Sequence, residues 1–192
     1  MNDRRTSLLV AAIEEIARTG TRGMRIEQVA KRANVSPALI YHHFGDRSTL
    51  LQSALEHIGA QADAYTAHTE GTGRENLLAT LLDEIQDDDL VRTNSAAWGE
   101  LRDSAIFELS LRPTIIRLTA QWVDDIAEVI RSGQLDGSLD NSIDPQELGV
   151  RLSSLVEGMS ARWLTGIMTT DEARRHLAAT AESLLAPAAT QR

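Results

Sequence analysis

The chain has 192 residues, of which 42% are apolar, with a formal net charge of −9 at pH 7 and no cysteine. This length allows one or two domains with cores of their own, and the lack of cysteine excludes disulfides, thiolate zinc sites and a cysteine nucleophile. The first apolar run is interrupted by Glu14, Glu15 and Arg18, so we expect neither a signal peptide nor a membrane-spanning helix, and we expect a cytoplasmic protein.

The charge is unevenly distributed along the chain. Residues 1–56 hold 8 Arg and Lys against 6 Asp and Glu, whereas residues 57–192 hold 11 against 22. The first segment therefore has a charge balance of +2 and is compatible with a polyanionic partner, although the whole chain is acidic.

Helical patterns fill the chain and strand signals are nearly absent, which predicts an all-α fold with about nine helices. The first helix ends at the segment 20–23, which begins and ends with glycine, and its apolar face consists of Leu8, Leu9, Ala12, Ile13, Ile16 and Ala17. A second helix is predicted from about Ile26 to Ala33, with Val29 and Ala30 on its apolar face.

The stretch VSPALIYHHF, residues 35–44, begins a third helix. Ser36 suits the N-cap, and Pro37 suits the first helical position, where a missing N–H costs nothing. Val35 is placed to pack on Ile40, and Phe44 continues that inward face one turn later. This helix is expected to have about two turns.

Further helices are predicted over about 46–71, 73–87, 90–108, 113–132 and 144–166, and from residue 170 onward. A loop rich in Gly, Asp and Ser precedes residue 144. Capping boxes begin the last two helices, with Asp144 and Thr169 as the caps, and Pro187 is expected to stop the last one.

Two short helices joined by a tight turn match the helix-turn-helix geometry, in which the second helix enters the major groove of DNA. Ala30 is small, as a close helix crossing requires, and Asn34 lies in the turn, where asparagine tolerates a left-handed backbone. The outward face of the second helix then consists of Pro37, Ala38, Leu39, Tyr41, His42 and His43.

The block Ser-x-x-x-Ile-Tyr-x-His-Phe, residues 36–44, is followed three residues later by the cation Arg47. With this block, residues 5–55 resemble the TetR family of bacterial transcriptional repressors. The resemblance further rests on Ala12, Ala17, Gly20, Ile26, Val29, Ala30, Ala33, Val35, Leu50 and Leu51. It implies a three-helix DNA-binding domain over residues 1–55 and a larger helical domain for effector binding and dimerisation over residues 56–192.

The resemblance also implies roles for single residues. Phosphate contacts are implied for Ser36, Tyr41 and Arg47, and contacts with base edges or the sugar-phosphate wall for Pro37, Ala38, Leu39, His42 and His43. Where many members have Thr or Ser, this chain has Met24-Arg25, so Arg25 is expected either to take over a phosphate contact or to be a solvated surface charge. Asn34 replaces the usual turn glycine, and Arg47 the usual lysine.

A metal or catalytic site is the alternative use of His42 and His43. Neighbouring residues on a helix point about 100° apart, so the two histidines cannot share a metal as an i, i+4 pair can. No third ligand has matching spacing, and neither a nucleophile elbow, a phosphate loop nor paired catalytic carboxylates are present. We therefore expect no catalytic residue, no metal and no cofactor, and a protein that is not an enzyme.

The C-terminal part offers candidates for two further sites. Because the family dimerises through its last two long helices, the resemblance implies a homodimer interface that contains Leu148, Leu152, Leu155, Met159, Leu177, Ala181 and Leu184. Large side chains that could line an effector cavity are Trp98, Phe107, Trp122, Met159 and Trp163. Ordinary core packing is the alternative for both sets.

The sequence thus predicts a dimeric transcriptional regulator, a repressor that binds a palindromic operator in double-stranded DNA and is released by a small apolar or aromatic effector. It would be nucleoid-associated when bound to DNA. The alternatives are a helical ligand carrier that keeps the helix-turn-helix as packing, which would be a monomer without salt-dependent DNA binding, and an enzyme.

Overall fold

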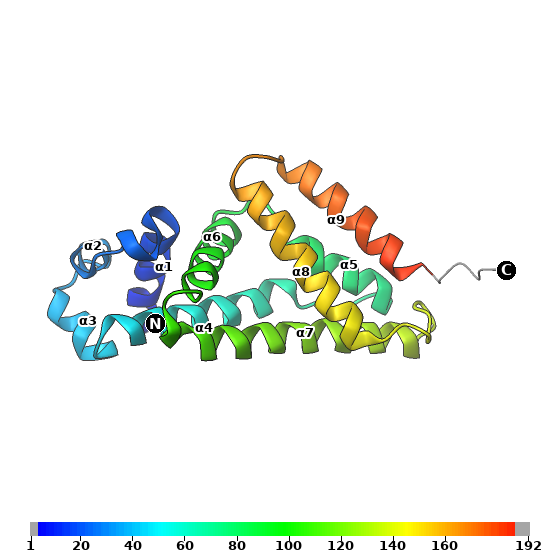
Figure 1. The fold of residues 1–192 in the computed structure, drawn as a ribbon, viewed down its shortest axis with the longest axis horizontal. Helices are drawn as coiled ribbons and strands as arrows, with labels where there is room; N and C mark the ends of the chain where they lie inside the picture. Colours follow the sequence, from blue (N-terminus) through cyan, green and yellow to red (C-terminus); the bar gives the residue numbers. More distant parts are fainter. Residues whose placement is uncertain (1–3, 187–192) are drawn as a thin grey trace. The chain divides into compact units, whose positions relative to one another are not determined.

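The computed structural model describes residues 4–186, and Figure 1 labels its helices. Within this range the fold is all-α, as predicted, with nine α-helices, one short 3-10 helix and no strand. The bounds are α1 Arg4–Gly23, α2 Ile26–Arg32, α3 Pro37–Phe44, α4 Arg47–Thr66, α5 Gly73–Asp83, α6 Asp89–Ser104, η1 Leu109–Leu111, α7 Arg112–Leu135, α8 Pro145–Leu164 and α9 Thr170–Leu185. The predicted stop at Pro187 lies outside the described residues.

The helices form two compact units. Unit 1 consists of the residues up to Asp63 together with Asp89–Leu118, and unit 2 consists of Ala64–Asp88 together with the residues from Thr119 onward. The domain boundary predicted after residue 55 follows the sequence motif, whereas packing also groups α6 and η1 with the first helices. The long helices α4 and α7 each begin in unit 1 and end in unit 2.

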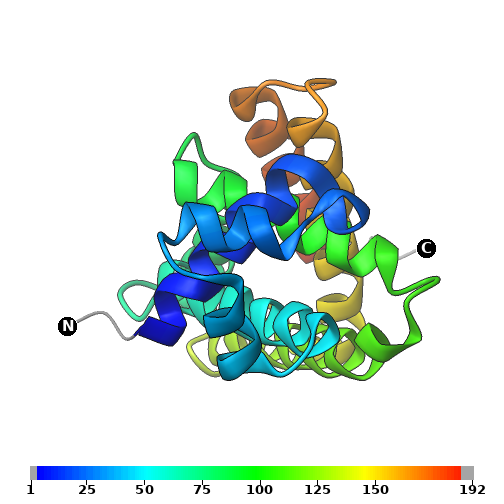
Figure 2. The same ribbon diagram turned by 90° about the vertical axis from the view of Figure 1, so that its left-hand side faces the viewer.

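The core of unit 1 is made of apolar faces of α1 to α4, α6 and η1. Its members include the fully buried Leu8, Ile16, Val29, Leu51, Leu101 and Leu111. The first three helices, drawn from dark blue to light blue in Figure 2, contribute half of the remaining core residues. Gly20, with a φ of 71°, breaks the helical backbone of α1, as the sequence pattern predicts.

Three predicted helices are too long. The helix predicted over 46–71 ends at Thr66, because the following residues are small and polar and Thr72 starts α5 with a capping box to Glu75. The helix predicted over 73–87 ends at Asp83, where Arg174 of α9 donates to the Leu82 and Ile85 carbonyls. The helix predicted over 90–108 ends at Ser104. There the side chain of Arg112 donates from Nε to the Ala105 carbonyl at 2.9 Å and from Nη2 to the Ile106 carbonyl at 2.8 Å, which satisfies backbone acceptors beyond the helix end.

Unit 2 is held together by helix ends as well as by apolar packing. The backbone N–H of Gly73 donates to the Asp136 carboxylate at 2.7 Å, and that of Arg74 donates to Ser138 Oγ at 3.1 Å, which joins the start of α5 to the end of α7. At the start of α8 only half of the predicted capping box is present: Asp144 accepts two backbone N–H bonds, while the Glu147 carboxylate pairs with Arg151. The capping box of Thr169 at the start of α9 is complete.

Between residues 4 and 186, no helix is both long enough and apolar enough to cross a membrane.

Gly73 provides a test of the packing in unit 2. A methyl group at this position would overlap the backbone of Gly133, and backbone atoms cannot move aside as a flexible side chain can. We expect Gly73→Ala to lower the free energy of unfolding by about 3 kcal/mol, measured by urea denaturation. In the matched control Gly99→Ala, a Cβ on α6 has nothing within 4 Å, so stability should stay equal or rise by up to about 1 kcal/mol. Equal effects of the two substitutions would contradict this packing.

Candidate DNA-binding surface

The helices α2 and α3 form a helix-turn-helix. Asn34 in the turn has a φ of 53°, the left-handed conformation predicted for it. The Val35 N–H donates to the Ala30 carbonyl at 2.9 Å. Ala30, Ile40 and Phe44 are buried in the unit 1 core and Val35 packs against it. These contacts hold the inner face of α3 and leave its other face toward solvent.

The outer face of α3 carries the residues predicted to contact DNA. Pro37, Ala38, Tyr41 and His42 are exposed, while Leu39 and His43 are half-buried. Ser36 occupies the N-cap position without forming a side-chain capping bond, so its exposed hydroxyl is not used to cap the helix. The side chains expected at a DNA groove thus lie on one short helix.

The two histidines have different surroundings. The His43 ring lies with its centroid 6.2 Å from that of Phe44, while the His42 ring meets the His43 ring edge-on at 5.6 Å. His43 therefore leans toward the core side of α3, and His42 is left on the outside. No group of three His, Cys, Asp or Glu residues that could hold a metal ion occurs among the described residues.

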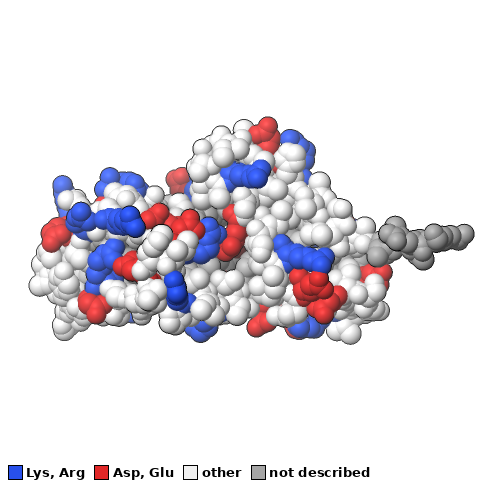
Figure 3. Space-filling view, in the orientation of Figure 1, with Lys and Arg blue, Asp and Glu red and all other residues white. Residues whose placement is uncertain are grey.

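The two predicted arginines are held by contacts within unit 1. Arg47 forms an ion pair with Glu108, with Nη1 2.7 Å from Oε1, and its Nη2 donates to the Thr21 carbonyl. Arg25 remains exposed, and its Nη1 donates to the Arg22 carbonyl at 2.8 Å. Figure 3 shows that Lys and Arg lie among Asp and Glu over the N-terminal helices, so this face is not uniformly basic.

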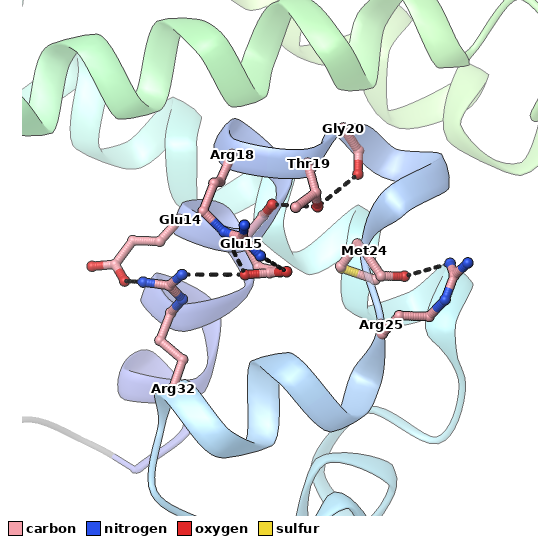
Figure 4. A network of polar contacts seen from close by, with 8 residues as sticks. All are labelled: Glu14, Glu15, Arg18, Thr19, Gly20, Met24, Arg25 and Arg32. Atoms are coloured by element: carbon pink, nitrogen blue, oxygen red, sulfur yellow. Dashed lines mark hydrogen bonds and ion pairs between the residues drawn. The ribbon is translucent and has the colours of Figure 1, made fainter.

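A buried carboxylate links α1 to α2 (Figure 4). The side chain of Glu15 is 2% exposed and receives hydrogen bonds from Arg18 at 2.7 Å and from Arg32 at 3.2 Å. Arg32 also pairs with the half-exposed Glu14 at 3.1 Å. Burial raises the pKa of Glu15, but the hydrogen bonds and positive charges of Arg18 and Arg32 outweigh it and hold the pKa below its ordinary value. Glu15 therefore stays ionised and fixes α2 against α1.

Sequence reasoning missed this network and the contacts of α6 with the N-terminal helices. The i, i+3 spacing of Glu15 and Arg18 is a signal for an ion pair, but nothing in the sequence joins them to Arg32. Similarly, Glu100 accepts from the Thr21 backbone at 2.9 Å, and Ser104 Oγ lies 2.6 Å from Thr21 Oγ1. These partners are about eighty residues apart in sequence, so only folding brings them together.

The five residues predicted to line an effector cavity are divided between the units. In unit 1, Trp98 packs against the core, whereas Phe107 is 76% exposed with the Arg22 guanidinium 5.9 Å from its ring centroid. In unit 2, Trp163 is buried and its Nε1 donates to Thr170 Oγ1 at 2.9 Å, while Trp122 and Met159 are half-buried.

The predicted dimer residues lie on α8 and α9, which pack on each other within the chain. Their burial falls into two classes. Buried in the single chain are Leu148, Leu152, Leu177 and Ala181, and half-buried are Leu155, Met159 and Leu184.

Two family models match the chain. One describes bacterial regulatory proteins of the tetR family and matches residues 8–54. The other describes the C-terminal part of BetI-type transcriptional repressors and matches residues 73–186, more than half of the chain. The chain belongs to the TetR family of bacterial regulators, and its C-terminal part is of the BetI type.

Individual proteins agree with this assignment. The HTH-type transcriptional regulator BetI of Burkholderia lata is 23% identical over 173 residues, which cover 86% of this chain and 82% of that protein. The regulator of the same name from Brucella anthropi is 32% identical over 99 residues, and this match spans 50% of each chain.

Solved structures agree as well. A TetR-family transcriptional regulator from Rhodococcus sp. is 44% identical with a TM-score of 0.89, over 97% of this chain and 100% of that one. A transcriptional regulator from Saccharomonospora viridis, solved in complex with choline, is 28% identical with a TM-score of 0.82, over 93% and 95% of the two chains. The predicted family is thus confirmed, and the chain is a DNA-binding transcriptional regulator and not an enzyme.

The link between α1 and α2 gives a test with a defined pH dependence. Glu15→Gln keeps the shape of the side chain but removes the charge that Arg18 and Arg32 face, so we expect a loss of about 2–3 kcal/mol at pH 7. Because the folded pKa of Glu15 is lowered, its contribution is complete above the ordinary value of 4.5 and disappears as the pH falls through the lower folded value. Urea midpoints of the two proteins should therefore converge in acid.

Glu14→Gln is the matched control, because Glu14 pairs with the same arginine but is half-exposed, whereas Glu15 is buried. Its substitution should cost about 0–1 kcal/mol. A Glu15→Gln difference that stayed constant down to about pH 3 would contradict the role of the ionised carboxylate.

Proposed function

We propose that this regulator is a repressor that binds a palindromic operator as a homodimer and is released from DNA by a small ligand. The observation that carries the proposal is the helix-turn-helix with an outward face of Tyr41, His42 and Leu39 on α3, a helix of eight residues. One such helix contacts too few base pairs for specific binding. A two-fold dimer presents two of them about 34 Å apart, which matches successive major grooves on one side of the duplex.

Each contact has a chemical rationale. Ser36 and Tyr41 carry exposed hydroxyls that can donate to phosphate oxygens, and Pro37, Ala38 and Leu39 provide apolar surface for thymine methyl groups. His42, on the outside of α3, is placed to contact base edges, and His43 supports it through its ring contact. Arg25 remains exposed beside the start of α2 and adds a positive charge next to the backbone of the duplex.

Arg47 has a carboxylate partner in the unbound protein. We propose that on DNA its guanidinium exchanges Glu108 for a phosphate, since both partners offer oxygen acceptors to the same donors. Glu108 would then compete with DNA, and its charge would lower the affinity for the operator.

The effector is proposed to be a small quaternary ammonium compound. The choline complex of the 28% identical regulator from Saccharomonospora viridis supports this class. Such a cation carries methyl groups, so it combines the apolar surface expected from the sequence with a charge. Aromatic side chains bind these cations through the faces of their rings.

Binding to the DNA upstream of its own gene would test the DNA contacts, with fluorescence anisotropy measured over a series of salt concentrations. We expect Tyr41→Phe to weaken binding by about 10-fold or more through the loss of a hydrogen bond to a charged group. Arg47→Ala should weaken binding to all sequences and reduce the salt slope by about 1, whereas Glu108→Gln should strengthen it. Leu39→Ala and His42→Ala should change sequence preference instead.

Tyr65→Phe, which alters a tyrosine of unit 2, is the control and should leave DNA binding unchanged. Wild-type binding no tighter than to a random duplex at equal salt would refute the proposed operator. Weaker binding by Glu108→Gln would mean that the pair with Arg47 stabilises the DNA-binding conformation.

Choline is the probe for the effector. Added to the protein–operator complex, choline chloride should lower operator affinity more than sodium chloride at the same ionic strength, because salt alone weakens protein–DNA contacts. Equal effects of the two salts would exclude choline as a releasing ligand.

A further inference from the structure

Asn94 on α6 is a buried polar residue without a partner. The residue is 1% exposed, and neither its Oδ1 nor its Nδ2 has a hydrogen-bond partner among the described residues. Other buried polar side chains are paired. Thr80 donates to the Thr66 carbonyl at 2.9 Å, and Ser153 to the Val150 carbonyl at 3.0 Å. Because unpaired buried amides are costly and rare in native proteins, the carboxamide of Asn94 calls for a partner.

The neighbours of Asn94 along α6 are apolar. Val91, Ala97 and Leu101 lie on the same side of the helix and are all buried. A leucine at position 94 would complete this apolar stripe. His57 Nε2 on α4 also lacks a partner among the described residues, but the His57 ring is partly exposed, whereas Asn94 is enclosed. Asn94 is therefore the polar interruption of an otherwise apolar helix face.

The chemistry of the free carboxamide defines its partner. Two N–H donors and one carbonyl acceptor are unpaired together, so the complementary group both donates and accepts. Apolar neighbours on the helix offer no compensating charge, which disfavours a charged group at this point. A hydroxyl group satisfies both conditions, since its oxygen accepts from Nδ2 while its hydrogen is donated to Oδ1.

We propose that the carboxamide of Asn94 binds the hydroxyl group of the effector and selects hydroxylated ligands over those without this group. The inference rests on the proposed ligand-released function and names a residue that the sequence did not suggest. A buried water molecule is the competing explanation, because water also donates and accepts. The two explanations differ in what removal of the amide does to the protein without ligand.

Thermal unfolding of the full chain without ligand separates them. If the Asn94 amide has no partner in the ligand-free protein, Asn94→Leu removes an unsatisfied amide and should raise the Tm by about 2–8 °C. If the amide is part of a water-bonded structure, the Tm should fall, as we expect for the matched control Thr80→Val, which loses a hydrogen bond that the structure contains. A fall as large as that of the control would overturn the proposal.

Ligand selectivity is the second measurement, made by calorimetry with choline and with ethyltrimethylammonium, which lacks the hydroxyl group. The wild type should bind choline about 10-fold more tightly, and Asn94→Ala should reduce this ratio to about one. A ratio that is unchanged in Asn94→Ala overturns the proposal. If the wild type binds neither cation, the proposed effector class is wrong, and the thermal result alone decides the role of Asn94: a higher Tm supports it and a lower Tm overturns it.

Discussion

The proposed DNA-binding surface depends on the burial of Ile40 and Phe44. An isolated helix of eight residues is not stable in water, so α3 is helical because these two side chains are enclosed by the core of unit 1. Their burial on one face leaves Tyr41 and His42 on the other. The left-handed Asn34 sets the direction in which the chain enters α3. Without this core the outward side chains would have no common surface.

Polar contacts outside the apolar core also hold the helices of unit 1 together. Glu15 binds α2 to α1 through Arg32, and Glu100 and Glu108 of the segment 89–118 bind Thr21 and Arg47. Of these two carboxylates, Glu108 neutralises the charge of Arg47, while Glu100 accepts hydrogen bonds from the uncharged Thr21. A count of charges along the sequence places these carboxylates far from the residues proposed to bind DNA, because the count ignores how the chain returns to unit 1.

The helix α6 connects the two proposed activities within unit 1. Asn94 and Ser104 are ten residues apart on α6, about 15 Å along the helix axis, and Ser104 lies against Thr21 of α1. A ligand bound at Asn94 would therefore act on the same helix that holds the N-terminal helices. A ligand that binds more tightly when α6 is in one position than in another shifts the population of the protein. It then favours the form that does not bind DNA.

Local sequence determined the helical class, the breaks at Gly20 and Asn34, the caps at Asp144 and Thr169 and the outward face of α3, because these depend on residues within one or two turns of each other. The ends of α4, α5 and α6 were missed, since Thr72, Arg174 and Arg112 act on them from other elements. Tertiary structure alone joined Glu15 to Arg32 and Arg47 to Glu108, and left Asn94 buried without a partner. Those features arise where distant segments meet, and no periodicity or spacing in the sequence records which side chains will face each other.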